Sequence, residues 1–162
     1  MAVNIASDIA RYFIHKSKPG TSENITNLKL QKILYYAQGL YLKNHRLPLF
    51  NERIEAWAHG PVVPDVYREF KKYKYNEIDK NKENTDFNNL STEEQLFLDS
   101  VWEELKKFSG KDLEEETHHH TPWKDKRDGL PEFVSTNDEI TVKEICNWFE
   151  TNDLFVYLQP VK

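Results

Sequence analysis

The hydrophobic and polar positions of the chain predict one long, nearly enclosed helix. Residues 28–42 (LKLQKILYYAQGLYL) carry ten apolar or aromatic side chains in fifteen positions, so no side of a helix here is suited to water. Thr26 and Asn27 are suitable caps for its first turn. Gln31 and Gln38 are two turns apart on one face, and a buried amide needs hydrogen-bond partners. We therefore expect both amides to hold neighbouring backbone, with contact to a bound partner as the alternative.

Apolar side chains at helical spacing predict three further helices. The first follows Asn4, its expected cap. The second begins with a capping box of Ser91 and Glu94 and is expected to end at Gly110, with a buried stripe of Leu96, Phe97, Val101, Trp102, Leu105 and Phe108. The third is capped by Thr141, and its predicted inner side consists of Val142, Ile145, Trp148 and Phe149. Each needs a partner for its apolar side, and the central helix is the nearest.

A strand-like alternation follows the central helix. Residues 54–59 (IEAWAH) alternate between apolar and larger or polar side chains, and Gly60 with Pro61 forces a turn. A short helix is expected to begin at Pro64 and to bury Val66, Tyr67 and Phe70. Residues 154–158 (LFVYL) are a β-type run that is expected to pair with the first strand. These elements predict a mainly α fold with a small antiparallel β element, organised around a buried central helix.

The length of the chain fits one globular domain, residues 1–162. Residues 74–90 are dense in Asn, Lys, Glu and Asp, which predicts a mobile loop with little to bury. This segment is too short to divide the chain into separate domains. Residues 111–117 and 123–127 are expected to form two short helices.

The charge balance disfavours a general nucleic-acid binder. The formal net charge is −5 and the pI is near 5.7, whereas phosphate contacts need a basic surface. Basic and aromatic side chains interleave over residues 68–75, so a nucleic-acid-binding regulator remains an alternative to an ordinary exposed helix end. Cys146 is the single cysteine, which excludes an intrachain disulfide, and no apolar run approaches the roughly 18 residues that span a bilayer. We therefore expect a cytoplasmic protein that does not enter the membrane.

The side chains with catalytic potential do not form a recognisable active-site motif. His118, His119 and His120 are adjacent, and neighbours on a helix point about 100° apart, so the three cannot easily converge on one metal ion. A metal-assisted enzyme that uses His59 and His118 with a carboxylate is the alternative. The sequence has no G-x-S-x-G nucleophile motif and no Gly-rich phosphate loop, and Cys146 is expected to fill the core. We therefore predict no catalytic residues, no metal and no cofactor.

Three separated motifs together resemble one known family. They are NLKLQKILYYAQGLYL, PLFNERIEAWAHGPVVPDVYREFKKY and LEEETHHHTPWKDKRD. Their order and spacing resemble the Panacea domain, the SocA-like antitoxin family that also includes phage-associated GepA-like proteins. The resemblance extends from the first helix to about Arg127 and is weaker in the last helix. It implies that residues 153–162 form a C-terminal extension beyond the usual end of the family.

The resemblance implies a mostly helical antitoxin of a toxin-antitoxin pair, which neutralises a cognate toxin by direct protein-protein binding. SocA-like members are also regarded as adaptors that deliver a toxin to an ATP-dependent protease. Carried over by motif, the candidate partner-binding residues are Lys29, Gln31, Lys32, Tyr36, Gln38, Trp57, Gly60, Pro61, Val63, Tyr67, Thr117, His118, Pro122 and Trp123. The third motif departs from the familiar form, because His119, His120 and Thr121 replace a charged or small pair before Pro-Trp.

Large aromatic side chains most often supply the decisive energy of a protein interface. Trp57, Tyr67 and Trp123 are therefore the candidate anchors for a partner. The alternative is that they fill the core of the domain.

Overall fold

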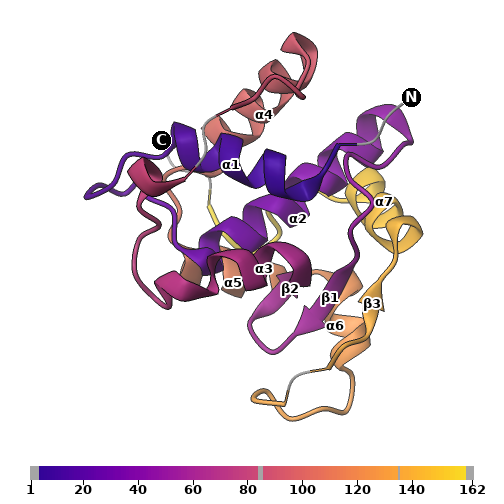
Figure 1. Ribbon diagram of the computed structural model, residues 1–162. Coiled ribbons are helices and arrows are strands. Elements are labelled where there is room, and N and C mark those ends of the chain that lie inside the picture. Colours follow the sequence, from indigo (N-terminus) through magenta and orange to yellow (C-terminus); the bar gives the residue numbers. More distant parts are fainter. Residues whose placement is uncertain (1–3, 84–85, 135, 160–162) are drawn as a thin grey trace.

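One helix runs through the middle of the computed structural model, and the other elements lie around it (Figure 1). The structure describes residues 4–83, 86–134 and 136–159. The central helix is α2 (Asn27–His45), and around it lie α1 (Ala6–Lys16), α3 (Pro64–Phe70), α4 (Thr92–Leu105), α5 (Gly110–Thr117), α6 (Thr121–Lys124) and α7 (Val142–Thr151). Short 3-10 helices are η1 (Lys71–Tyr73), η2 (Lys80–Lys82) and η3 (Asp125–Arg127). The predicted mainly α fold with a small antiparallel β element is confirmed.

Helix α2 is enclosed along almost its whole length, as its composition predicts. The hydroxyl of Thr26 caps it by accepting the N–H of Lys29 at 3.2 Å. Helix α7 packs closely at Gly39, where an added Cβ would lie 2.2 Å from the ring of Phe149. That ring also lies edge to face against Tyr35, with the centroids 5.5 Å apart. The predicted buried central helix is therefore confirmed, and aromatic rings fill much of the space around it.

A three-stranded antiparallel sheet, in the order β2-β1-β3, covers one side of the lower part of the molecule (Figure 1). Strands β1 (Ile54–Trp57) and β2 (Gly60–Val62) form a hairpin in which Trp57 pairs with Gly60. On its other edge β1 pairs with β3 (Glu139–Ile140), not with the C-terminal run that the sequence predicts.

The prediction that residues 154–158 form a strand is wrong. The backbone N–H groups of Val156, Tyr157 and Leu158 all donate to the carboxylate of Glu116, at 3.1, 2.9 and 2.8 Å. In a strand successive N–H groups point to opposite sides, so three in a row cannot reach one carboxylate. A buried acidic side chain on α5 therefore determines the course of this apolar run.

Four residues of the predicted core lie at or near the surface, and one of them, Phe97, is half-buried. Leu96 is 64% exposed, and the buried residues of α4 are Leu98, Val101, Trp102 and Leu105. Val142, in the first turn of α7, is 42% exposed, and Tyr67 of α3 is half-buried. Each stands at the edge of an apolar stripe, where a helix leaves the core.

Gly110 begins a helix and does not end one. Helix α4 ends at Leu105, and Ser109 then caps α5 in a second capping box with Asp112. The hydroxyl of Ser109 accepts the N–H of Asp112 at 3.0 Å, and the carboxylate of Asp112 accepts the N–H of Ser109 at 3.1 Å. The predicted turn over residues 123–127 is divided between α6 and η3.

The segment predicted to be mobile, residues 74–90, is anchored to the body near its middle. Ile78 is 1% exposed and donates its N–H to the carbonyl of Ile25 at 2.8 Å. The mobility of this loop stays a prediction, as do the single-domain assignment and the C-terminal extension, whose last three residues lie outside the described part of the chain. Among the helices of the described residues, none combines the length and apolar character that crossing a membrane requires.

Candidate partner-binding site

A cavity of about 320 Å³ opens beside the β1–β2 hairpin, and we call it the hairpin pocket. It lies at the N-terminal half of α2, where α3, the hairpin and α5 come together (Figure 1). Its lining residues come from five segments of the chain: Asn27, Leu28, Gln31, Lys32, Trp57, Ala58, His59, Val62, Tyr67, Lys74, Tyr75, Lys111 and Glu114.

One wall of the hairpin pocket is aromatic. The rings of Trp57 and Tyr67 pack edge to face with centroids 4.9 Å apart. The indole N–H of Trp57 donates to Glu55 at 2.9 Å, which fixes the ring against the hairpin. Both rings are half-buried, and Tyr75 beside them is 97% exposed. This wall offers preorganised aromatic area to a partner.

The floor of the pocket holds a fully buried lysine, Lys32. Its amine donates to the carbonyl of Pro61 at 3.1 Å. Burial lowers the pKa of Lys32 to about 7, and the nearby carboxylate of Glu114 offsets only part of that effect. The first residue of β2, which lies over this amine, requires glycine: Gly60 has φ +108°, and an added Cβ would lie 2.6 Å from Cε of Lys32 and 2.9 Å from Oγ1 of Thr117.

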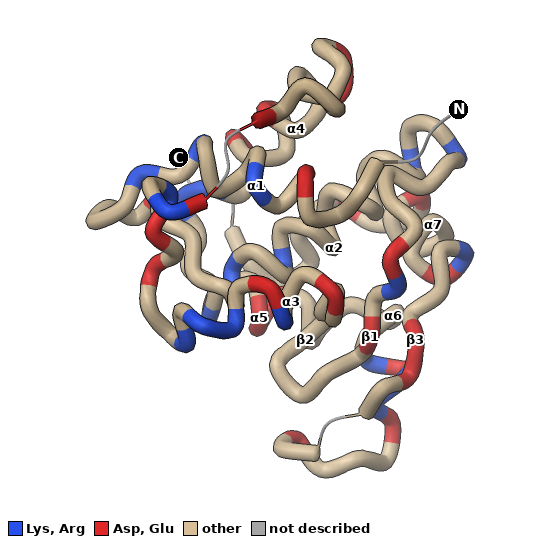
Figure 2. Tube along the Cα trace, viewed as in Figure 1, with Lys and Arg blue, Asp and Glu red and all other residues tan. Residues whose placement is uncertain are grey.

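Charged side chains surround the aromatic wall. Glu114, with a side chain 4% exposed, lies 2.9 Å from Nδ1 of His59 and accepts from Lys111 at 3.4 Å. With Lys32 and Lys74, three lysines line the pocket against this single carboxylate. Figure 2 shows more basic residues directly after α3, on a chain whose net charge is negative. The pocket is therefore a locally positive region of an acidic protein.

The third motif, residues 113–128, contacts the hairpin through Trp123. The indole N–H of Trp123 donates to the carbonyl of Trp57 at 2.7 Å, and the Trp123 ring stacks on His118 with centroids 4.0 Å apart. Nε2 of His118 is buried and has no hydrogen-bond partner among the described residues. Burial lowers the pKa of His118, against the opposing effect of Glu114. His118 is therefore held as a neutral ring inside this support.

Most of the predicted site residues come together around the hairpin pocket. Four line it, namely Gln31, Lys32, Trp57 and Tyr67. The amide oxygen of Gln31 accepts the N–H of Val63 at 3.0 Å, so Gln31 holds the start of α3 in place. The residues that support the lining are Gly60, Pro61, Val63, Thr117, His118 and Trp123, and Pro122 is buried at the start of α6.

Three predicted site residues lie elsewhere, and each holds the fold together. Lys29 donates to the carbonyl of Lys106 at 2.6 Å, at the C-terminal end of α4. The hydroxyl of Tyr36 donates to the carbonyl of Leu154 at 3.3 Å. The amide of Gln38 donates to the carbonyl of Phe50 at 2.8 Å and accepts the N–H of Leu49 at 2.7 Å. All three are nearly fully buried, so a partner cannot reach them on the folded protein.

Sequence reasoning missed several residues of the pocket. Lys74 and Tyr75 belong to the interleaved basic and aromatic stretch, which the sequence associates with nucleic acid and not with the hairpin. Lys111 and Glu114 are three residues apart on α5, a spacing that indicates one helix face. Nothing in the local pattern indicates that this face meets the hairpin.

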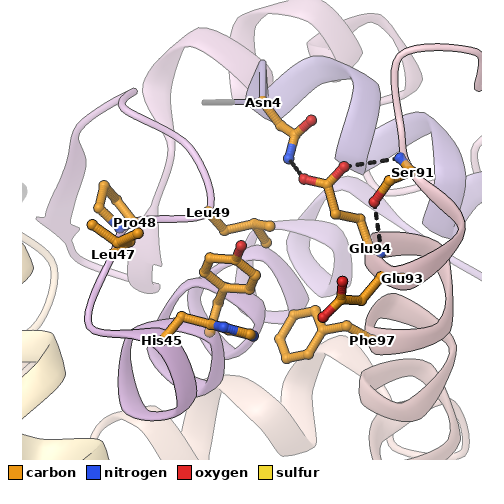
Figure 3. Close-up of a pocket in the computed structure, with 10 residues that line it drawn as sticks. Asn4, His45, Leu47, Pro48, Leu49, Ser91, Glu93, Glu94 and Phe97 are labelled. Carbon is orange, nitrogen blue, oxygen red and sulfur yellow. Dashed lines mark hydrogen bonds between the residues drawn. The ribbon is translucent and has the colours of Figure 1, made fainter. Parts of the chain in front are cut away.

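A larger cavity, of about 600 Å³, lies at the opposite end of α2 (Figure 3). None of the predicted partner-binding residues lines it. Tyr41, His45 and Phe97 form part of its wall. Some of its polar groups are already paired: Glu94 accepts the N–H of Ser91 at 2.9 Å and the side-chain amide of Asn4. It is therefore a weaker candidate than the hairpin pocket.

The metal-assisted alternative requires several ligands that converge on one point. His59 and Glu114 do approach each other, but the described residues contain no group of three or more His, Cys, Asp or Glu side chains placed to hold a metal ion. The three histidines at the end of α5 instead stack on separate rings: His118 on Trp123, His119 on Tyr157 and His120 on Trp148.

Comparison with known proteins gives two similarities. A model of the family described as "Antitoxin SocA-like, Panacea domain" matches residues 30–124. The chain is also similar to Antitoxin SocA of Caulobacter vibrioides (strain NA1000 / CB15N), with 54% identity over 46 residues. That alignment covers 28% of this chain and 24% of the relative, so the chain spans about a quarter of the length of the curated protein that it matches. No solved structure matches the chain.

Proposed function

The chain belongs to the SocA-like antitoxin family with a Panacea domain, and from this premise we propose that it neutralises a cognate toxin by binding it directly at the hairpin pocket. The proposal assigns the protein no catalytic step. A toxin is neutralised when a stable complex covers its active surface, and for this a rigid, partly apolar patch is sufficient.

One observation carries the proposal. Residues from three motifs far apart in the sequence converge on one open pocket, and its half-buried wall contains Trp57 and Tyr67. The pocket floor is held by contacts inside the protein, such as Gln31 to Val63 and Lys32 to Pro61. A surface of this kind changes little on binding, which favours affinity because less conformational freedom is lost.

The test is rescue of growth in cells. The chain is coexpressed with the product of the neighbouring reading frame, and we expect that product to stop growth alone and to be harmless with the chain. The double variant Trp57→Ala/Tyr67→Ala is expected to lose rescue. Phe133→Ala is the matched control, because Phe133 is aromatic, 84% exposed and outside the pocket. Rescue by the double variant at normal protein levels would contradict the proposed site.

Direct inhibition and delivery to an ATP-dependent protease both begin with this complex, and the lifetime of the toxin separates them. Under direct inhibition, the toxin persists in rescued cells and is recovered as a complex with the chain. Under delivery, the toxin is degraded rapidly, and removal of the protease restores toxicity while the two proteins still bind. We propose the first route, because covering the toxin requires only the surface described above.

A further inference from the structure

We propose that the hairpin pocket receives an acidic side chain, Asp or Glu, from a protein segment whose neighbouring residue is aromatic or aliphatic. The inference rests on the proposed function, since the segment would belong to the toxin, and it specifies the chemistry that the pocket recognises.

The charges of the pocket are positive where the chain as a whole is negative. Lys74 and Lys111 stand at the rim and Lys32 at the floor, while Glu114 is the single acidic residue of the lining. That carboxylate is already engaged by His59 at 2.9 Å and by Lys111 at 3.4 Å. Because the chain as a whole carries a net charge of −5, a locally positive pocket gives an acidic segment a preferred place to bind.

The floor lies over a buried amine that an anion in the cavity affects through space. Lys32 is 0% exposed and donates to the carbonyl of Pro61, so the partner's carboxylate pairs with the rim lysines and does not touch this amine. An anion in the cavity stabilises the charged form of this amine, which burial disfavours. Binding of a carboxylate therefore takes up a proton near neutral pH, whereas binding of a neutral side chain does not.

The aromatic wall favours a protein segment over a free anion. Trp57 and Tyr67 offer half-buried ring faces next to the lysines, and Tyr75 adds an exposed ring at the rim. A free carboxylate or phosphate ion interacts only with the charged groups of the pocket and not with its aromatic wall. A segment with an apolar residue beside its acid uses both features.

The first experiment uses peptide probes on the full chain. Acetyl-Phe-Glu-amide and acetyl-Phe-Gln-amide are titrated while the indole N–H resonance of Trp57 is followed by NMR. We expect the Glu peptide to bind about fivefold more tightly, with the difference falling as NaCl is raised. Calorimetry in buffers of different ionisation enthalpy should show proton uptake with the Glu peptide alone. Equal affinities, or no shift with either peptide, would overturn the inference.

The second experiment compares two charge reversals. Lys111→Glu places a like charge beside Glu114 inside the pocket, whereas Lys107→Glu makes the same change at an exposed position outside it. We expect only Lys111→Glu to remove the preference for the Glu peptide. An equal effect of the two variants would show a general charge effect and would overturn the inference.

The same variants separate this inference from the proposed function. If Trp57→Ala abolishes toxin binding while Lys111→Glu leaves it unchanged, the hairpin pocket binds the toxin but does not recognise an acidic side chain. In that case only the inference fails. If no neighbouring product is neutralised at all, the proposed function fails, and the peptide titrations still decide which side chain the pocket accepts.

Discussion

The carboxylate of Glu116 lies 2.7 Å from Nε2 of His120, and both side chains are fully excluded from solvent. The same carboxylate accepts three successive N–H groups from residues 156–158. A carboxylate only accepts, so Nε2 carries the hydrogen and Nδ1 is left to accept from the hydroxyl of Tyr35, 3.1 Å away. This network joins α2, α5 and the C-terminal segment.

Removing the charge of Glu116 should therefore release the C-terminal segment. We expect Glu116→Gln to lower the free energy of unfolding by about 3 kcal/mol, because it breaks a buried charged network. Urea unfolding gives the energy, and hydrogen exchange at the amides of residues 156–158 gives the location. Glu115→Gln, at the next position of α5, is the control and should change neither. Unchanged protection of those amides in Glu116→Gln would contradict the assignment.

Stability should fall in mild acid because of the same pair. Burial lowers the pKa of His120 below 6.5, despite the hydrogen bond that it donates to Glu116, so the unfolded chain takes up this proton first as the pH falls. Burial alone would raise the pKa of Glu116, but its hydrogen bonds outweigh that effect and lower it. Both groups therefore stabilise the fold less as the pH drops. Unfolding free energies from pH 8 to 4.5 should decline below about 6.5, and His120→Gln should flatten the decline.

Gly60, at the start of β2, should not tolerate a side chain. In Gly60→Ala, the alanine has to adopt a left-handed backbone conformation, and its Cβ clashes with Lys32 and Thr117. We therefore expect the free energy of unfolding to fall by more than about 2 kcal/mol. Gly20→Ala is the matched control, because Gly20 has φ +81° and nothing within 4 Å of the added Cβ. Gly20→Ala should lower the free energy of unfolding by about 1 kcal/mol, which is the cost of the left-handed backbone conformation alone. Thermal or urea unfolding of both variants measures the difference.

Replacing the buried amine of Lys32 should stabilise the protein while weakening its site. We expect Lys32→Met to raise the free energy of unfolding at pH 6 by about 1 to 4 kcal/mol, since a buried charge gives way to an apolar side chain of similar length. Folding lowers the pKa of Lys32 to about 7 from 10.5, so the wild-type chain gains stability as the pH rises through that window. The advantage of Lys32→Met should shrink accordingly by pH 9.5. A variant that is less stable than wild type at pH 6 would show that the amine holds the fold.

Aromatic anchors should matter more for toxin binding than charges at the edge. We expect Trp57→Ala or Tyr67→Ala to weaken the complex more than Lys71→Glu with Lys72→Glu. Lys71 and Lys72 are exposed and outside the lining of the pocket, and charges at a rim mainly change the rate of association. Isothermal calorimetry with the purified toxin gives both affinities, and the reverse order would refute the assignment of the anchors.

Local signals predict the fold well where one short pattern determines an element. The enclosed α2 and the caps at Ser91 and Thr141 follow from residues within a few positions of one another. The hairpin beside Gly60 does too, although its turn lies at residues 58–59 and not at the predicted Gly60–Pro61. The resemblance of three motifs also indicates which segments meet at the site. Within those segments, burial separates buried supports such as Gln38 from half-buried residues such as Trp57, and a motif alone does not make that distinction.

The wrong predictions concern segments whose structure depends on residues far away in the sequence. Residues 154–158 have strand propensity, but the buried carboxylate of Glu116, 40 or more positions earlier, binds their N–H groups. Likewise, Lys111 and Glu114 join the hairpin pocket only because α5 packs against α2 and β2. No local pattern contains that information.

The outward-facing side chains of the hairpin pocket come from a turn, a short helix and a loop, whereas α2 beneath them is enclosed. His59, Tyr75 and Lys111 are exposed; Tyr75 can be exchanged without disturbing what lies under it, whereas a replacement of His59 or Lys111 has to leave a partner for the buried carboxylate of Glu114. Descendants of one ancestral scaffold can therefore diverge in what they recognise through a few superficial replacements, and no intermediate along such a path needs to lose its folded state.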